Sequence, residues 1–579
     1  MKKPCDEEES FYYFCCSVLR RLLFGSSSNS MDKADSCSAQ SELELLFREY
    51  ANREINALLW IGLILVTALL LRKLAGLFRL WAKGRPIPGP PSPSFFGHSR
   101  LFSVADLTEF LSKSHQIYGA VVKLWLGPTQ LLVSIKDPED IKDMLLKAVD
   151  KLPTAGRAFH LSFGRSSLFV SSFNEVQKRR DLLETEINGK LLERANVIPT
   201  KVLDCVMERI LDVSNKGSLD CKMVSQHFAF TILGTTLFGD AFLSWSEAAI
   251  YEELLMTIAK EACFWASYRL IPFWRWGFWR YQYLCTKFRS LTQDIIQLRS
   301  HNFRVFYETD QKHNGRRNTV DGAVSLAPHF SIVGMPVNLL SPELDGHLNP
   351  REPCGNVISM MFHGCLTTAG LIGNVLVRLA TNFEIQDKIH SEIVTVREGL
   401  QGKDQQGIGK MVLLLATLYE SARLLPAGPL LQRCSLSHDL NLKTGVTIPS
   451  GAILVVPVQL VQMDDSNWGS DASQFNPYRF LSKAEKRSDS EEFVDMEWDS
   501  YFLKDPNENA AFLPFGYGTR ACLGQKFAIL GVATLFASLL EYYEIRLQPG
   551  FENNPEPVMN NCVLQLLPSP KIVFVKRNS

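Results

Sequence analysis

The sequence predicts a mainly α-helical protein with small β-sheets, preceded by a single transmembrane helix. Residues 201–304 and 523–540 carry apolar side chains in a pattern typical of long helices. Short β-rich runs with Gly and Pro turns occupy residues 121–134 and 440–458, which predicts small sheets. The third observation is an apolar run at residues 55–71, near the length that a membrane-spanning helix requires.

The composition restricts the functional class. Of the 579 residues, 46% are apolar and 21% are charged, which is enough to form a large core in one big enzyme domain or in two or three smaller domains. The 61 basic and 61 acidic side chains cancel, so the excess of positive charge typical of a nucleic-acid-binding protein is missing. The 13 cysteines are irregularly spaced, which argues against a disulfide framework and favours a reducing compartment.

The N-terminal part is expected to form an extension and a membrane anchor. Residues 1–54 contain a Ser-rich stretch and only a short apolar segment, so a disordered extension is predicted there. Residues 55–71 are the predicted anchor, because a span needs about 20 residues with ~17 as the lower limit. Basic residues follow the anchor, beginning with Arg72 and Lys73, and acidic residues prevail before it. This asymmetry predicts that the chain after the anchor lies in the cytosol.

Beyond the anchor we expect a hinge and then one catalytic domain. Residues 72–91 are predicted to form a basic, proline-rich hinge, because the stretch from Pro86 to Pro91 cannot continue a helix. The catalytic domain is expected at residues 92–579, with a β-hairpin turning at Gly127-Pro128. Two segments are expected to be irregular, one a polar loop and the other an acidic surface insertion: 304–353 and 488–509.

The most specific pattern is Phe515-Gly516-Tyr517-Gly518-Thr519-Arg520-Ala521-Cys522-Leu523-Gly524, which fits Phe-x-x-Gly-x-Arg-x-Cys-x-Gly at every fixed position. A thiolate can hold haem iron, a guanidinium suits a propionate, and glycines let the backbone pass close to a flat macrocycle. The apolar run after Cys522 predicts a helix, whose N-terminus would stabilise a thiolate. The alternative is a buried structural cysteine, which does not account for the other fixed residues.

This pattern is similar to the haem-thiolate signature of the cytochrome P450 superfamily, and the chain resembles that family from about residue 86 to residue 576. The resemblance implies haem b as the cofactor, Cys522 as the iron ligand, and Arg520 at a haem propionate. Phe515 and Gly524 are expected to contact the same haem. Two further arginines are implied as propionate contacts, Arg433 and Arg180, although Val176 stands where the family has a tryptophan four residues before the second. For each of these two arginines, an ordinary surface position is the alternative.

The resemblance also implies a structural cluster upstream of the cysteine. Glu420 and Arg423 are three residues apart, so both charges lie on one face of a predicted helix. Arg479 lies in a Pro-x-Arg-Phe element that is expected to complete a Glu-Arg-Arg cluster. We expect this cluster to fix the loop that presents Cys522, and its disruption to cost about 3–5 kcal/mol.

The helix on the oxygen side of the haem departs from the family pattern Ala/Gly-Gly-x-Asp/Glu-Thr-Thr, because this chain has His363-Gly364-Cys365-Leu366-Thr367-Thr368. Gly364 can still open a groove beside the haem, and the hydroxyls of Thr367 and Thr368 remain. Leu366 replaces the acidic residue and cannot relay a proton. Water, Thr367 or His363 is therefore expected to supply the proton path, or the enzyme does not use the usual route.

A strongly aromatic segment occupies residues 263–284, where ten of 22 side chains are aromatic and arginines are interleaved with them. Such a composition is typical of the membrane interface, and a buried core is an equally good interpretation. Contact with single-stranded nucleic acid is disfavoured by the zero net charge and by the predicted span.

The sequence therefore predicts a membrane-anchored haem-thiolate monooxygenase that inserts one oxygen atom into a lipophilic small molecule. The resemblance implies NADPH-cytochrome P450 reductase as the electron-donating partner, and no nucleic-acid partner is expected. The anchor predicts a single-pass protein of the endoplasmic reticulum membrane with a cytosolic catalytic domain. Two alternatives remain open: a peroxide-rearranging isomerase or dehydratase, motivated by Leu366, and a non-catalytic haem-binding sensor.

Overall fold

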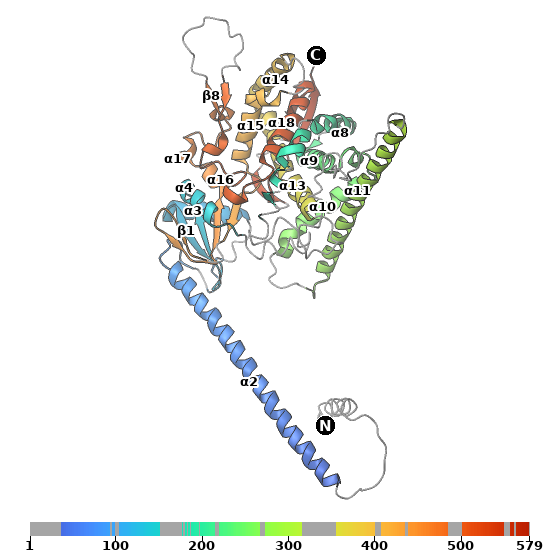
Figure 1. The fold of residues 1–579 in the computed structure, drawn as a ribbon. Helices are drawn as coiled ribbons and strands as arrows, with labels where there is room; N and C mark the ends of the chain where they lie inside the picture. Colours follow the sequence, from blue (N-terminus) through green and yellow to red (C-terminus); the bar gives the residue numbers. More distant parts are fainter. Residues whose placement is uncertain are drawn as a thin grey trace, which may run out of the picture. The chain divides into compact units, whose positions relative to one another are not determined.

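The computed structural model describes residues 36–92, 104–150, 219–266, 273–314, 355–399, 407–434, 438–483, 501–548, 556–560 and 563–577, and most of 177–214. It divides the chain into a unit that ends at Arg79 and a unit that begins at Leu80. The second unit is mainly helical with small sheets, as the sequence predicts (Figure 1).

The first unit is dominated by helix α2, which begins at Ser36 and ends at Gly84. Its part from Tyr50 to Gly84 is long and apolar enough to cross a membrane and contains the predicted anchor. Residues 36–54, for which disorder is predicted, form part of this helix, and neither Pro nor Gly interrupts this Leu- and Glu-containing stretch. Residues 1–35 lie outside the described part of the chain.

The second unit starts with the last turn of α2, which is hydrogen-bonded to residues further along the same unit. The Trp81 indole N–H donates to the carbonyl of Pro128 at 2.8 Å, and the Lys123 ammonium donates to the carbonyls of Gly84 and Arg85 at 3.1 and 2.6 Å. The predicted hinge at residues 72–91 is thus helical as far as Gly84, and only its proline-rich remainder is extended.

A four-stranded sheet forms one side of this unit (Figure 1). The predicted hairpin is present as β1 (Val121–Trp125) and β2 (Leu131–Ile135), joined at Gly127, whose φ of 88° suits glycine. Strand β7 (Ile453–Pro457) pairs in parallel with β2, and β4 (Leu430–Arg433) pairs antiparallel with β7. The remaining strands form smaller sheets: β3 Leu219–Asp220, β5 Leu440–Asn441, β6 Thr447–Ile448, β8 Leu481–Lys483, β9 Tyr501–Leu503, β10 Tyr543–Leu547, β11 Glu556–Asn560, β12 Val563–Leu567 and β13 Lys571–Lys576.

Most of the helices make up the other side, where α13 runs through their centre, whereas α3 lies beside β1 (Figure 1). Helix α13 packs most extensively on α9 and also contacts α15 and α18, so both large apolar clusters include its side chains. The described helices are α3 Val104–Tyr118, α4 Pro138–Lys147, α7 Leu192–Ala195, α8 Ile198–Ser214, α9 Cys221–Phe238, α10 Ala248–Ala266, α11 Trp276–Asn314, α13 Gly355–Thr381, α14 Phe383–Glu398, α15 Val412–Leu424, α16 Val458–Gln462, α17 Asp465–Trp468 and α18 Gln525–Tyr542.

Two irregular segments were predicted less well than the helices. The polar loop expected at 304–353 is wrong for residues 304–314, because α11 continues to Asn314, and residues 315–354 lie outside the described part. Of the acidic insertion expected at 488–509, the described residues include β9 and a short 3-10 turn at Pro506–Glu508. Residues 484–500 are also outside the described part.

Candidate active site

The cysteine loop is closed by backbone hydrogen bonds just before α18. The N–H of Cys522 donates to the carbonyl of Phe515 at 2.7 Å, and that of Ala521 donates to Gly518 at 2.9 Å. Gly518 has a φ of 72°, and a Cβ there would lie 3.1 Å from the carbonyl oxygen of Leu145. Glycine at this position therefore serves the loop itself, whereas a Cβ at Gly524 would enter open space.

The Cys522 thiol is exposed, yet protein atoms surround it. Burial raises the pKa of this thiol, while the N–H of Gly524 and the charge of Arg180 lower it. The N–H and the guanidinium are the partners that a thiolate at a helix N-terminus requires.

Three arginines lie near Cys522 and near one another. Arg180 donates from Nη2 to the carbonyl of Ala521 at 2.6 Å, and Arg520 donates from Nε to the carbonyl of Val149 at 3.0 Å. Arg433, at the end of β4, is only 5% exposed, and its Nε has no hydrogen-bond partner among the described residues. Burial and then the charges of Arg520 and Arg180 lower the pKa of Arg433 to about 10.

The neighbouring arginines carry like charges that repel one another. Burial and the charge of Arg180 also lower the pKa of Arg520 to about 10, although Asp150 opposes this effect. Buried cations that repel one another, one of them with an orphaned N–H, fit an anion carrying more than one carboxylate. All three arginines predicted from the sequence are thus brought to the neighbourhood of Cys522, and neither Arg433 nor Arg520 is a surface residue.

The oxygen-side segment lies in the middle of α13. Thr367 is exposed although this helix is mostly buried, and its hydroxyl donates to the carbonyl of His363 at 2.7 Å. Thr368 is 9% exposed and Gly364 lies close to Leu233, with 3.0 Å between a Cβ at that glycine and the nearest leucine carbon. Thr367 is therefore the member of this segment that is open to a small molecule or to water.

Leu366 faces the protein interior, whereas His363 is half-buried. Leu366 is 2% exposed and belongs to the apolar cluster formed by α9, α10, α11 and α13. The imidazole of His363 packs edge-on against Phe362, with 5.2 Å between the ring centroids. An apolar side chain at position 366 is thus explained by the packing around it.

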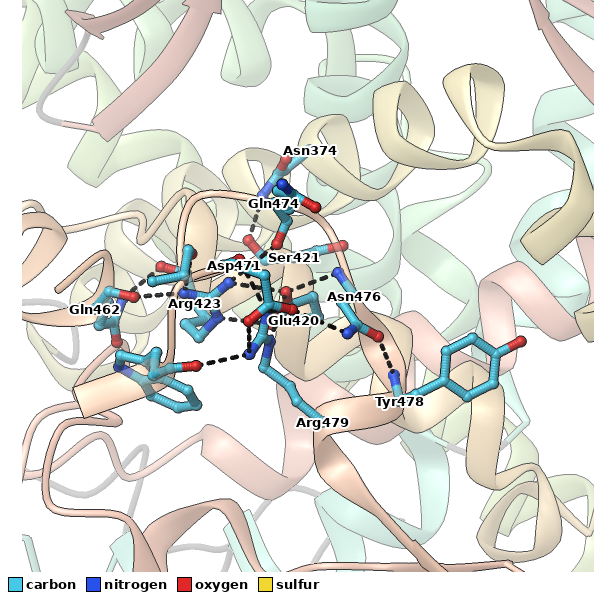
Figure 2. Close-up of polar contacts among 12 residues, drawn as sticks. Asn374, Glu420, Ser421, Arg423, Gln462, Asp471, Gln474, Asn476, Tyr478 and Arg479 are labelled. Carbon is cyan, nitrogen blue, oxygen red and sulfur yellow. Dashed lines mark hydrogen bonds and ion pairs between the residues drawn. The ribbon is translucent and has the colours of Figure 1, made fainter. Parts of the chain in front are cut away.

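The Glu-Arg-Arg set forms one buried cluster (Figure 2). Glu420 and Arg423 are both 0% exposed, and Glu420 accepts from Nε and Nη2 of Arg423 at 2.7 and 2.8 Å. Arg479 donates from Nε to Glu420 at 3.1 Å and pairs with Asp471 at 3.0 Å. The N–H of Asn476 donates to Glu420 at 2.9 Å, so the chain around Arg479 is held at two points.

Two other buried polar residues were not predicted, one beside this cluster and one at the opposite end of α15. Gln462 links Arg423 to Leu513 through its side-chain amide. Glu392 on α14 accepts from the N–H groups of Leu413 and Leu414 at the start of α15. Neither residue lies in a recognisable motif, and Gln or Glu in a sequence is usually a surface residue, so the sequence held no signal for them.

Comparison with known proteins identifies the class to which this fold and site belong. The family model described as Cytochrome P450 matches residues 87–574. The chain is 26% identical to 11-oxo-beta-amyrin 30-oxidase of Glycyrrhiza uralensis over 79% of this chain and 81% of that protein. It is also 26% identical to lithocholate 6-beta-hydroxylase of Mesocricetus auratus, over 81% and 87% of the two chains. Cytochrome P450 3A6 of Oryctolagus cuniculus is 24% identical over 80% and 86%.

The chain belongs to the cytochrome P450 family. It is accordingly an oxidoreductase, a haem-thiolate monooxygenase in the general sense, with haem iron as its cofactor. The residues present fit this group, because an accessible thiol and two buried arginines lie close together. The apolar part of α2 is consistent with membrane anchoring.

Proposed function

We propose that this protein is a membrane-bound monooxygenase that uses NADPH-derived electrons to insert one atom of dioxygen into a lipophilic small molecule. The observation that carries the proposal is the accessible Cys522 thiol, close to which Arg180, Arg433 and Arg520 lie within electrostatic reach of one another. The two relatives named as an oxidase and a hydroxylase support the same reaction class.

In this proposal Cys522 holds the iron of haem b, and the three arginines hold its propionates. When bound, the haem supplies the chemistry of dioxygen activation. Burial raises the pKa of the Cys522 thiol, and the N–H of Gly524 and the charge of Arg180 oppose that effect, so both would help the sulfur to bind iron as a thiolate. Arg433 would satisfy its orphaned Nε on a propionate oxygen. Phe515 closes the loop through its carbonyl and packs on the core beside Phe512.

Thr367 is proposed to hold the water that delivers protons on the oxygen side of the haem. Because its hydroxyl hydrogen is directed to the carbonyl of His363, its oxygen is left to accept a hydrogen from water. Leu366 is buried in the apolar cluster, so no acidic side chain shares this task at that position. Gly364 and Thr368 are proposed to shape the surface of α13 around Thr367. Because position 366 offers no acid, protons are proposed to reach the oxygen through water bound to Thr367.

The cysteine assignment is tested first. Cys522→Ala should bind little or no haem, and the ferrous carbon monoxide complex should lose the absorption band typical of a thiolate ligand. Circular dichroism of the same preparation shows whether the variant is folded. A folded variant that keeps the thiolate band would rule out Cys522 as the ligand.

The replacement of the usual acidic residue by Leu366 motivates a second candidate, a family member that rearranges a supplied hydroperoxide and needs neither NADPH nor a reductase. The two candidates differ in the effect of Thr367→Ala. In a monooxygenase this change should lower the ratio of product formed to NADPH consumed, because proton delivery is no longer coupled to electron transfer. In a peroxide-rearranging enzyme, NADPH is not consumed and hydroperoxide turnover stays nearly unchanged.

The location is proposed to be the endoplasmic reticulum membrane, with a single span at residues 55–71 and the catalytic unit in the cytosol beside NADPH-cytochrome P450 reductase. The basic residues after the span support this orientation. A second membrane contact is proposed at the start of α11, where large aromatic side chains are exposed, Trp276 at 87% and Phe273 at 66%. Protease added to intact microsomes should digest the catalytic unit. Full protection of that unit would show that the orientation is the opposite one.

A further inference from the structure

Gln462 occupies an unusual position between the Glu420–Arg423–Arg479 cluster and the cysteine loop. It is the last residue of α16 and is 0% exposed. Its Nε2 donates to the carbonyl of Arg423 at 2.6 Å, and its own carbonyl accepts from Nη1 of Arg423 (Figure 2). Gln462 and Arg423 are therefore joined by two hydrogen bonds, and in each bond the side chain of one residue donates to the backbone carbonyl of the other.

The other end of the same amide reaches the segment that leads into the cysteine loop. The Oε1 atom of Gln462 accepts from the N–H of Leu513 at 2.9 Å, and Leu513 is 1% exposed. The carbonyl of Leu513 then accepts from the N–H of Gly516 at 3.0 Å, and Phe515 accepts from Cys522 at 2.7 Å. These hydrogen bonds, joined by the backbone of residues 513–516, thus connect Arg423 to the backbone of Cys522.

The chemistry of this link requires a group that donates and accepts at once. A carboxamide does both, a carboxylate at the same place can only accept, and an aliphatic side chain can do neither. Without the acceptor, the buried N–H of Leu513 would be left unsatisfied, which is costly in a protein interior. The link therefore requires the amide, and an aliphatic side chain of similar size cannot replace it.

We propose that Gln462 is a positioning residue that transmits the geometry of the Glu420–Arg423–Arg479 cluster to the loop carrying Cys522. It touches neither substrate nor cofactor, and it acts through Leu513. The inference rests on the proposed function in one respect, the role of Cys522 as the iron ligand.

The chain offers a matched control in Gln386. This residue of α14 is also 0% exposed and is equally well bonded. Its Nε2 donates to the carbonyls of Leu379 and Ile545 at 2.9 and 3.0 Å, and its Oε1 accepts from the N–H of Ile545 at 2.7 Å. Gln386→Leu therefore removes a buried amide of the same kind that ties α13 to β10, with none of its hydrogen bonds going to the cysteine loop.

The experiment compares Gln462→Leu, Gln386→Leu and the unchanged full-length holoenzyme by hydrogen exchange and by absorbance. Gln462→Leu should raise amide exchange in peptides covering residues 513–522 by about tenfold or more, because the Leu513 N–H loses its acceptor. It should also speed conversion of the ferrous carbon monoxide complex from the thiolate form to the form that has lost the thiolate. Gln386→Leu should raise exchange around Ile545 and leave both readouts of the cysteine loop unchanged.

Gln462→Glu serves if the leucine variant does not fold, because it keeps an acceptor for Leu513 and removes the donor to Arg423. It should keep the Leu513 amide protected and still destabilise the thiolate form. The inference is overturned if both leucine variants affect the cysteine loop equally, or if Gln462→Glu leaves the thiolate form as stable as in the unchanged protein. If the unchanged protein lacks the thiolate band, the proposed function fails, while the exchange data alone still decide whether Gln462 holds the loop.

Discussion

Replacing Glu420 by Gln tests the buried cluster most directly, because it removes one charge and almost no volume. Glu420 accepts four hydrogen bonds, two from Arg423 and one each from Arg479 and the N–H of Asn476. A glutamine oxygen has two lone pairs, and its NH₂ group would face guanidinium donors. At least two donors then lose their acceptor at about 1–3 kcal/mol each, and Arg423 keeps a charge at 0% exposure.

The expected loss is therefore about 3–5 kcal/mol in the free energy of unfolding, as for other buried ion pairs that lose one partner. Urea unfolding of the holoenzyme, followed by circular dichroism and by the haem absorption band, measures it. Asp471→Asn is the matched control, because Asp471 binds the same Arg479 but its side chain is 39% exposed. The cluster would have no special role if Glu420→Gln lowered the unfolding midpoint no more than Asp471→Asn does.

Three further predictions concern other parts of the chain. Burial raises the pKa of Glu392 to about 7, so the stability that its proton contributes is present below about pH 4.5 and lost as the pH rises through about 7; Glu392→Gln should flatten the unfolding midpoint over that range. Gly234→Ala should cost about 1–3 kcal/mol, because its Cβ would lie 2.0 Å from the Phe242 ring, whereas Gly409→Ala enters open space and should have little effect on the melting temperature. Trp276→Ser should reduce the quenching of tryptophan fluorescence by brominated lipids in nanodiscs, and unchanged quenching would place that indole outside the bilayer.

Much of the fold was predictable because local patterns agree with the final structure. The Gly127-Pro128 turn specifies the β1–β2 hairpin, and the apolar run after Cys522 becomes α18. The predictions failed at element ends, where composition is a weak guide. Polarity suggested a loop from residue 304, yet α11 continues to Asn314, and the Ser-rich N-terminal composition hid a helix that begins at Ser36.

The candidate site was predictable to the extent that its residues lie in motifs. The signature and the Glu-x-x-Arg spacing named Cys522, Glu420 and Arg423, but no spacing indicates that Gln462 spans from Arg423 to Leu513. That link depends on three segments far apart in the sequence, and a single Gln carries no pattern. The direction in which Leu366 points is likewise a matter of helix packing, which the sequence around it does not reveal.

The convergence of Arg180, Arg433 and Arg520 has a consequence for the biogenesis of the protein. A chain that folds without its cofactor must bring three like charges together, and each lowers the stability of the structure that holds the others. A ligand that binds only the folded form and carries the opposite charge shifts the folding equilibrium by mass action. Newly made chains in a cell short of haem would therefore be the ones most open to proteolysis, and cofactor supply would set the amount of protein that accumulates.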